Sequence, residues 1–271
     1  MDILSYTFFQ NALLGSLLAS IACGIIGTYI VTRRLVFISG GITHASFGGI
    51  GIGLFAGISP ILSAAIFSVF SAFGIEWLSK RNDVREDSAI ALFWTFGMAV
   101  GIIFSYLSTG FTPDLTSFLF GNILTIGRSD LIMLGILAVI LIFFFYRYIN
   151  PIISIAFDRE FARSQGINVS LFEYILIMLA ALTIVSCLRM VGVMLAISLL
   201  TIPQITANLF TYHFKTMIWL SIGIGFISCL GGLFLSYRWE VPSGASIIFV
   251  SILIYAICKL WKIYVFRKIK S

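Results

Sequence analysis

Charged side chains are scarce in this sequence. Only 10% of its 271 residues are Asp, Glu, Lys or Arg, whereas 60% are hydrophobic and the mean hydropathy is +1.09. Soluble domains carry about 25% charged residues, and a soluble core of this length cannot hide so much apolar surface. The shortage of charge therefore excludes an ordinary soluble domain and indicates a chain that is solvated mostly by lipid.

Several chemical motifs are missing as well. No Gly-x-x-x-x-Gly-Lys-Ser/Thr phosphate loop is present, so we expect no ATP hydrolysis by this chain and no bound cofactor. His-Glu-x-x-His and Gly-x-Ser-x-Gly are also absent, which disfavours an intramembrane protease, although His44 has Ser46 nearby. The four cysteines lack CxxC spacing and lie in apolar runs, so we expect reduced packing residues: Cys23, Cys187, Cys229 and Cys258.

Apolar runs of membrane-spanning length recur along the whole chain. A transmembrane helix needs about 20 mostly apolar residues, and this rule predicts an all-α, polytopic membrane bundle of about eight or nine spans. Residues 1–271 are expected to form a single transmembrane domain, because no soluble domain is evident. The predicted spans are 8–32, 41–57, 60–79, 88–107, 130–148, 170–188, 190–210, 216–236 and 245–262.

Lysine and arginine residues predict the orientation. If the 149–169 loop is cytoplasmic, 14 of the 17 Lys and Arg residues lie inside, and only Arg128, Arg189 and Arg238 lie outside. This pattern predicts an N-terminus outside the cell and a cytoplasmic C-terminus. It also accounts for the net charge of +6 without a nucleic-acid partner. The first apolar run, from near Phe8, is too long for a cleaved signal peptide and lacks a basic segment before it.

The 108–129 segment has two possible interpretations. Its apolar centre, residues 117–120, is too short to cross a membrane. The segment either lies at the outer surface or enters the membrane as a re-entrant segment covered by protein.

Small residues open the second predicted span. Gly41, Ala45, Gly49, Gly53 and Gly57 recur every four residues, which predicts a stripe that another helix backbone approaches closely.

His44 lies beside that stripe, one turn from both Gly40 and Gly48. It is the only His, Asp, Glu, Lys or Arg residue well inside a predicted span, and such residues are functional candidates. Imidazole is a good ligand for zinc, iron or copper. The structural alternative is a histidine that is hydrogen-bonded to a neighbouring helix.

The loop after the fifth span contains the pattern of a short helix at 158–166. Asp158 suits the N-cap, Glu160 the first turn, Arg163 the last turn and Gly166 the C′ position. On pattern alone, the alternative is a solvated surface helix.

The 190–210 span contains Pro203, which removes a backbone donor and can break a helix. Broken helices inside membranes often line transport pathways. The alternative is an ordinary packed kink.

These segments, in this order, resemble the metal-ion permease family of ABC importers. Residues 39–45 match the spacing of the family's Gly-Asp-Ala-Leu-Ser-His-Ala motif, and 158–166 resembles its coupling helix, Asp/Glu-Glu-x-Ala-x-x-x-Gly. Residues 189–207 resemble its Arg-x-Val-Gly…Ile-Pro…Ala stretch, and 240–244 its acidic-x-Pro-Ser-Gly turn. The stretch from Phe120 to Asp130 also fits, so the resemblance spans about residues 8–260.

The resemblance implies a fold similar to cobalamin and siderophore importers. It implies a homodimer in a prokaryotic inner membrane, separate ATPase subunits that bind ATP, and an extracytoplasmic binding protein that delivers zinc, manganese or iron as substrate. It also implies that the loop helix couples to the ATPase through Asp158, Glu160, Phe161, Ala162, Arg163 and Gly166. Helix packing or the pathway would involve Gly40, Gly41, Gly48, Gly49, Gly53, Gly57 and Pro203, with His44 as a metal ligand.

The sequence departs from the family in the second span. Gly40 stands where the motif has Asp, and Gly48 stands where it has Pro. Asp and His at i and i+4 would share a helix face, but only His44 remains here. An importer of metal chelates, of siderophore or cobalamin type, is therefore the alternative function. A channel or a scaffold leaves the capped loop helix unexplained.

Overall fold

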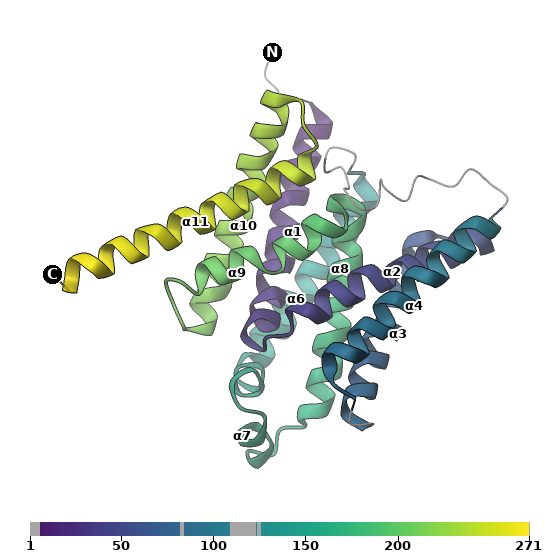
Figure 1. Cartoon of the computed structure of the whole chain (residues 1–271), viewed down its shortest axis with the longest axis horizontal. Coiled ribbons are helices and arrows are strands. Elements are labelled where there is room, and N and C mark those ends of the chain that lie inside the picture. Colours follow the sequence, from purple (N-terminus) through teal and green to yellow (C-terminus); the bar gives the residue numbers. More distant parts are fainter. Residues whose placement is uncertain (1–5, 82–83, 109–122, 124–125, 271) are drawn as a thin grey trace.

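The computed structural model describes residues 6–81, 84–108, 123 and 126–270. Helices account for nearly all of this part of the chain, and no strand occurs in it, so the predicted all-α class is confirmed (Figure 1). Most of the 108–129 segment lies outside the described residues. The helices are α1 (Thr7–Thr32), α2 (Val36–Ala56), α3 (Pro60–Arg81), α4 (Glu86–Leu107), α6 (Arg128–Phe157), α7 (Arg159–Ser164), α8 (Val169–Leu199), α9 (Ile202–Ala207), α10 (Phe214–Trp239) and α11 (Ser243–Lys270).

Eight of these helices are long and apolar enough to cross a membrane, which confirms the predicted polytopic bundle. The predicted span 190–210 is the exception, because the chain there forms two short helical pieces. Gly192, with φ 73° and ψ 172°, separates the last part of α8 from the rest of that helix, and α8 ends before α9 begins at Ile202. Glycine adopts this positive φ without the strain that a side chain would add.

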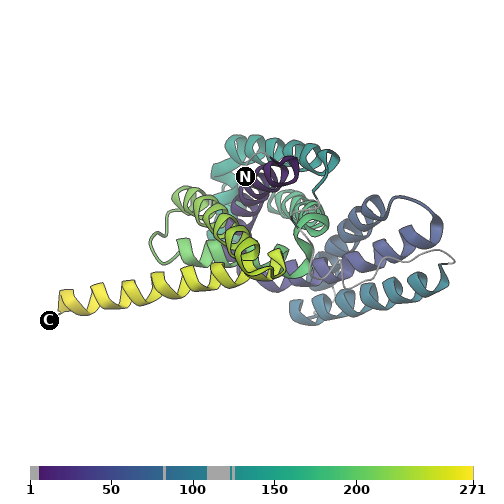
Figure 2. The ribbon, with the colours of Figure 1, turned by 90° about the horizontal axis from the view of Figure 1, so that it is seen from above.

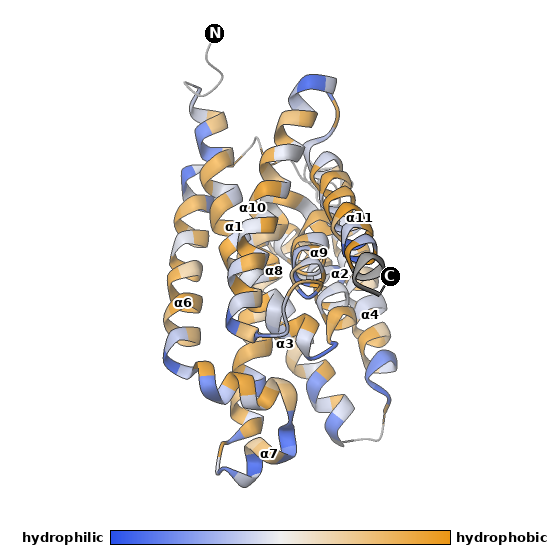
Figure 3. Cartoon of the chain, turned by 90° about the vertical axis from the view of Figure 1, so that its left-hand side faces the viewer, coloured by the Kyte–Doolittle hydropathy of each residue, from blue (hydrophilic) through white to orange (hydrophobic). Residues whose placement is uncertain are grey.

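The helices form two neighbouring groups. Seen from above, α2, α3 and α4 lie together on one side, and α1, α6, α8 and α10 lie on the other, while α11 extends away from the bundle (Figure 2). The α1 and α2 helices are the most enclosed, whereas α4, α6, α10 and α11 expose large apolar side chains such as Phe143, Trp219 and Phe234. Along the bundle the helices consist largely of hydrophobic residues (Figure 3), as expected where lipid is the solvent.

The two ends of the bundle differ. The start of α1 and the short helix α7 lie at opposite ends of the molecule (Figure 3). Hydrophilic residues gather around α7 and the neighbouring helix ends. The α7 end therefore carries a polar surface that is available to an aqueous partner.

Candidate functional site

The short helix α7 is capped at both ends. The Asp158 Oδ1 atom accepts hydrogen bonds from the backbone N–H groups of Glu160 and Phe161, each at 3.0 Å. At the other end, the N–H of Gly166 donates to the carbonyl of Arg163 at 2.9 Å, and that of Ile167 donates to the carbonyl of Ala162 at 3.1 Å. This is a Schellman motif, and its left-handed residue is Gly166 at φ 76°.

The inner face of α7 is anchored to the bundle. Ala162 is fully buried against Ile155 at the end of α6 and Val169 at the start of α8. On its outer face, Phe161 is 53% exposed, and Glu160 pairs with Arg163 at 2.8 Å in solvent. An exposed pair of this kind contributes little to stability. The helix therefore presents a polar and aromatic surface on a firmly held base.

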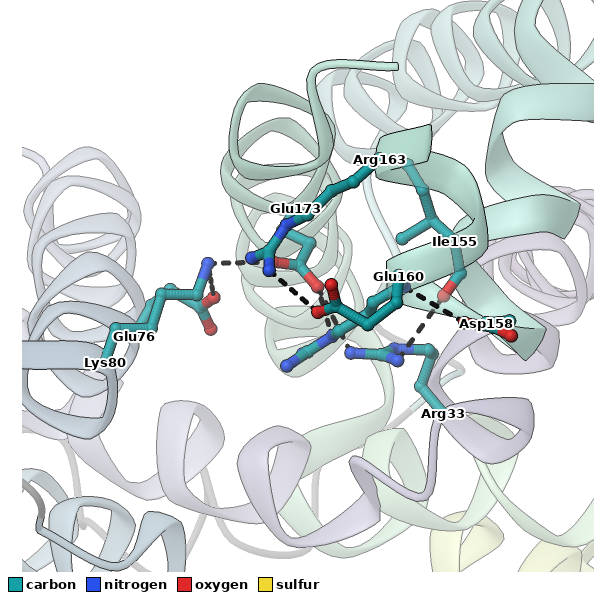
Figure 4. A network of polar contacts seen from close by, with 9 residues as sticks. Arg33, Glu76, Lys80, Ile155, Asp158, Glu160, Arg163 and Glu173 are labelled. Atoms are coloured by element: carbon teal, nitrogen blue, oxygen red, sulfur yellow. Dashed lines mark hydrogen bonds and ion pairs between the residues drawn. The ribbon is translucent and has the colours of Figure 1, made fainter. Parts of the chain in front are cut away.

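A buried carboxylate lies directly behind α7. Glu173, in the first turns of α8, is 2% exposed and contacts three cationic side chains (Figure 4). Its Oε1 atom lies 2.6 Å from Arg159 Nε and 3.2 Å from Arg33 Nη2, and its Oε2 atom lies 2.7 Å from Lys80 Nζ. Lys80 also pairs with Glu76 at 2.5 Å.

The cluster around Glu173 joins four elements. Arg33 follows the last turn of α1 and also donates to the carbonyl of Ile155 at 3.4 Å. Lys80 and Glu76 lie in the last turns of α3, Arg159 begins α7, and Glu173 belongs to α8. A displacement of α7 therefore acts directly on the ends of α1, α3 and α8 through ionic contacts.

Sequence reasoning missed this cluster, although a signal was present. Glu173 lies one turn inside the predicted span 170–188, and Glu76 lies inside the predicted span 60–79. Carboxylates at such positions are costly unless they are paired. Their shared membrane side and the nearby Arg33, Lys80 and Arg159 could have indicated a charge cluster.

The glycines of α2 allow close contact with two helices. A Cβ atom at Gly49 would lie 2.5 Å from the Ala64 Cα atom of α3, and Gly53 likewise faces Pro60. Gly41 and Gly51 instead face Ile90 and Gly101 of α4, and Gly48 lies between Phe67 of α3 and the Gly97 carbonyl of α4. The residues that face a neighbour therefore lie on two sides of α2 rather than on one stripe.

Gly57 differs from the predicted packing role. It lies at the C-cap of α2 with φ 68°, and an added Cβ atom would meet nothing within 4 Å. Its conformation ends the helix, so it does not allow close approach of a neighbouring helix.

His44 lies between α2 and α4 and is partly buried. Its ring stacks on Trp94 of α4 with the centroids 4.2 Å apart and the planes 6° apart, so the imidazole lies against an aromatic face. Its Nδ1 atom is buried without a hydrogen-bond partner in the described structure. Gly40 has room beside it, because an added Cβ atom would meet only the Trp94 ring, at 3.9 Å.

No metal centre is assembled around His44 in the described part of the chain. Within that part, no group of three or more His, Cys, Asp or Glu side chains is placed to hold a metal ion. What His44 itself offers is an unpartnered imidazole nitrogen, Nδ1.

Pro203 begins a helix and does not kink one. It occupies the first turn of α9, where its missing N–H group is not needed. Helical geometry is interrupted twice before Pro203, at Gly192 and again between α8 and α9. Next to it, fully buried Gln204 donates from Nε2 to the carbonyl of Cys23 at 2.8 Å and to that of Leu199 at 3.1 Å. This side chain ties the broken segment to α1.

The fold is that of the ABC importer permeases. The chain superimposes on PsaBC from Streptococcus pneumoniae, solved in complex with Fab, with a TM-score of 0.84 and 27% identity over 94% of this chain and 91% of that one. A putative metal-chelate type ABC transporter in an inward-facing conformation has the same fold, with a TM-score of 0.71 and 14% identity over 93% and 85% of the two chains.

The chain belongs to the ABC 3 transport family, which matches residues 5–262. It is 39% identical to the uncharacterized membrane protein slr2045 of Synechocystis, over 94% of this chain and 90% of that protein. It is 35% identical to the manganese transport system membrane protein MntC of Halalkalibacterium halodurans, over 94% and 88%. It is 31% identical to a probable iron transport system membrane protein of Haemophilus influenzae, over 95% and 94%. The predicted family of metal-transport permeases is thus confirmed.

Proposed function

We propose that this chain is the permease subunit of an ATP-driven importer of divalent metal ions. Two copies form the pathway, separate ATPase subunits dock on α7, and an extracytoplasmic binding protein delivers the ion. The observation that carries this proposal is the pair of features at one end of the bundle: a doubly capped α7 and, behind it, the Glu173 cluster that joins α7 to α1, α3 and α8. Orientation follows, with α7 cytoplasmic and the N-terminus outside.

Rigid transmission explains why α7 is built in this way. ATP binding closes the paired ATPase subunits and displaces the helix docked on each of them. A frayed helix would absorb that displacement, whereas α7 has both ends hydrogen-bonded and Ala162 locked against the bundle. The displacement therefore reaches the span ends, and packed helices rock as bodies between two states.

The test is metal-dependent ATP hydrolysis and uptake by the whole complex in proteoliposomes. We expect manganese, zinc or iron(II), supplied with the binding protein, to stimulate hydrolysis and to accumulate in the vesicle lumen. Stimulation by a siderophore or cobalamin chelate, with none by the free ions, would reject the metal-ion proposal. That second function is favoured by one observation: the described residues assemble no set of three or more metal ligands.

His44 provides a more specific arm of the same assay. We propose that its free Nδ1 atom contacts the ion in transit, so His44→Ala lowers uptake at limiting metal by about tenfold, the effect of losing ~1.4 kcal/mol of binding. Gly40→Asp adds a carboxylate one turn away, where the structure leaves room. This variant should bind the metal more tightly and reach half-maximal uptake at a lower metal concentration. Unchanged uptake by His44→Ala at limiting metal would return His44 to a packing role against Trp94.

Uncoupling of hydrolysis from uptake is expected for Gly166→Pro. Proline cannot adopt φ 76° and has no N–H to donate to Arg163, so the Schellman motif is lost. We expect about tenfold fewer ions imported per ATP, because a helix that has lost its C-terminal cap transmits the displacement poorly. Glu160→Ala, which alters the docking face only, should act in the same direction. Gly223→Ala is the matched glycine control, because its added Cβ atom meets nothing within 4 Å. Normal uptake by Gly166→Pro would contradict the role of α7.

A further inference from the structure

An apolar groove runs along the outside of the bundle between α1, α6 and α10. Its volume is about 500 Å³, and isoleucines from all three helices line it, including Ile21, Ile142 and Ile222. Trp219 and Tyr146, which are 74% and 85% exposed, flank it. The volume lies in the range of sites that hold whole small molecules, and the lining matches a hydrocarbon chain.

A second cavity of about 530 Å³ adjoins the groove toward the α7 end. It lies between the last turns of α6, at Ile153 and Phe157, and the segment 212–216. Its lining includes polar side chains: Tyr212, His213 and Thr216. Lys215 lines both cavities and so marks the point where the apolar part meets the polar part.

Lys215 carries an uncompensated charge at that junction. The side chain is exposed, and no acidic partner pairs with it anywhere in the described structure. It lies in the first turn of α10, where the helix dipole adds further positive potential. The junction therefore favours an anion whose remaining bulk is hydrocarbon.

The depth of the junction agrees with such a ligand. At 1.5 Å per residue, the 26 residues of α10 extend about 39 Å, which exceeds the hydrocarbon thickness of about 30 Å. Its first turn thus lies at the headgroup level of one leaflet, the level at which Trp and Tyr side chains also gather. Basic pockets between helices at this level suit anionic lipid headgroups.

We infer that the two cavities form a binding site for one anionic phospholipid in the leaflet on the α7 side. An acyl chain lies in the groove between α1, α6 and α10, Lys215 pairs with the phosphate, and the glycerol headgroup occupies the polar cavity near His213. The bound lipid would fill the space between α10 and the α6 end that leads into α7.

Lipid retention by the full-length chain tests this inference. The protein is purified in detergent with equal amounts of palmitoyl-oleoyl phosphatidylglycerol and palmitoyl-oleoyl phosphatidylcholine, and the lipids retained per chain are counted by native mass spectrometry. We expect selective retention of one phosphatidylglycerol. Lys215→Gln should lower its occupancy about fivefold, the factor that corresponds to ~1 kcal/mol for a basic residue near an anionic lipid.

Two further variants separate charge from shape. Ile142→Trp fills the groove from an exposed position without changing charge, so it should displace the lipid as well. Lys259→Gln is the matched control, because it removes an exposed lysine of α11 that lies over the Tyr255 ring and outside both cavities. It should retain the lipid fully. Equal retention of the two lipids by the unmodified chain would overturn the inference, and so would full occupancy in folded Lys215→Gln.

The competing occupant of the groove is a second copy of the chain. Trp219→Cys in a Cys258→Ala background tests for such an interface. The other cysteines are buried, so the introduced thiol is the one available for an intermolecular disulfide. An intermolecular disulfide formed in the membrane would make the groove an interface between copies and would overturn the lipid site. Rejection of the lipid site would not contradict the proposed transport function, because metal-stimulated ATP hydrolysis is measured in a separate assay.

Discussion

Glu173→Ala should strongly destabilise the folded permease. The substitution removes the carboxylate that contacts all three of Arg33, Lys80 and Arg159. Of the ion pairs described at the junction of the four elements, only the Lys80–Glu76 pair then remains. Removing one partner of a buried ion pair costs about 3–5 kcal/mol. We expect about 3 kcal/mol here, because the Lys80 and Arg159 side chains are 31% and 41% exposed and water relieves part of the penalty.

The measurement is the stability of the purified permease in detergent, followed by circular dichroism during heating. Glu173→Gln keeps the shape of the side chain and isolates the loss of charge, so it should also melt well below the unmodified protein. The matched control is Glu160→Gln, which alters a 78% exposed side chain of a surface pair and should change stability by less than about 0.5 kcal/mol. A Glu173→Gln protein that melts with the unmodified protein would show that the cluster does not hold these helices together.

The caps of α7 are a feature that the local sequence predicts correctly. Asp158, Glu160, Arg163 and Gly166 were assigned to helix positions from spacing alone, and the structure has Asp158 at the N-cap and Gly166 in the left-handed conformation. Capping depends on residues within one turn of each other, so the sequence contains nearly all the information that is needed. The same holds for the spans, whose length and hydropathy are local properties.

Contacts between distant segments were beyond such reasoning. Glu173 contacts Arg33, 140 positions away in the sequence, and Lys80, 93 positions away. No local sequence pattern indicates that these side chains come together. Pro203 illustrates a partial success. A proline in an apolar run was expected to break the helix, and helical geometry is interrupted directly before it, between α8 and α9. The additional break at Gly192 was not predicted.

The glycines of α2 predict a close approach but not its partners. Spacing of four residues marks one face, yet the residues that meet α4 include Gly48 and Gly51, which fall outside that spacing. The matching glycines of α4, Gly97 and Gly101, lie in a predicted span with ordinary hydropathy, and their own spacing of four residues does not identify the helix that they face. Complementary small residues on two helices become visible only when the helices are placed side by side.

Gly101→Val should separate α4 from α2 and abolish assembly of the transporter. A Cβ atom at Gly101 would lie 2.5 Å from the Phe47 carbonyl oxygen, and one at Gly51 would lie 2.8 Å from the Gly101 Cα atom. Both obstacles are backbone, which cannot rotate away as a side chain can. In lipid, helix association depends on such close packing, and overpacking a tight interface costs about 1–3 kcal/mol or more.

Open glycines elsewhere in the bundle supply the control. Gly135 of α6 and Gly223 of α10 have no atom within 4 Å of an added Cβ, so Gly135→Ala and Gly223→Ala should raise helix stability by about 0.5–1 kcal/mol. In detergent, the melting temperature of purified Gly101→Val should therefore fall, whereas those of Gly135→Ala and Gly223→Ala should rise. Because His44 stacks on Trp94 across the same α2–α4 contact, Gly101→Val should also disturb that ring pair, seen as a change in tryptophan fluorescence. Equal melting of Gly101→Val and Gly135→Ala would contradict a backbone-to-backbone contact between α2 and α4.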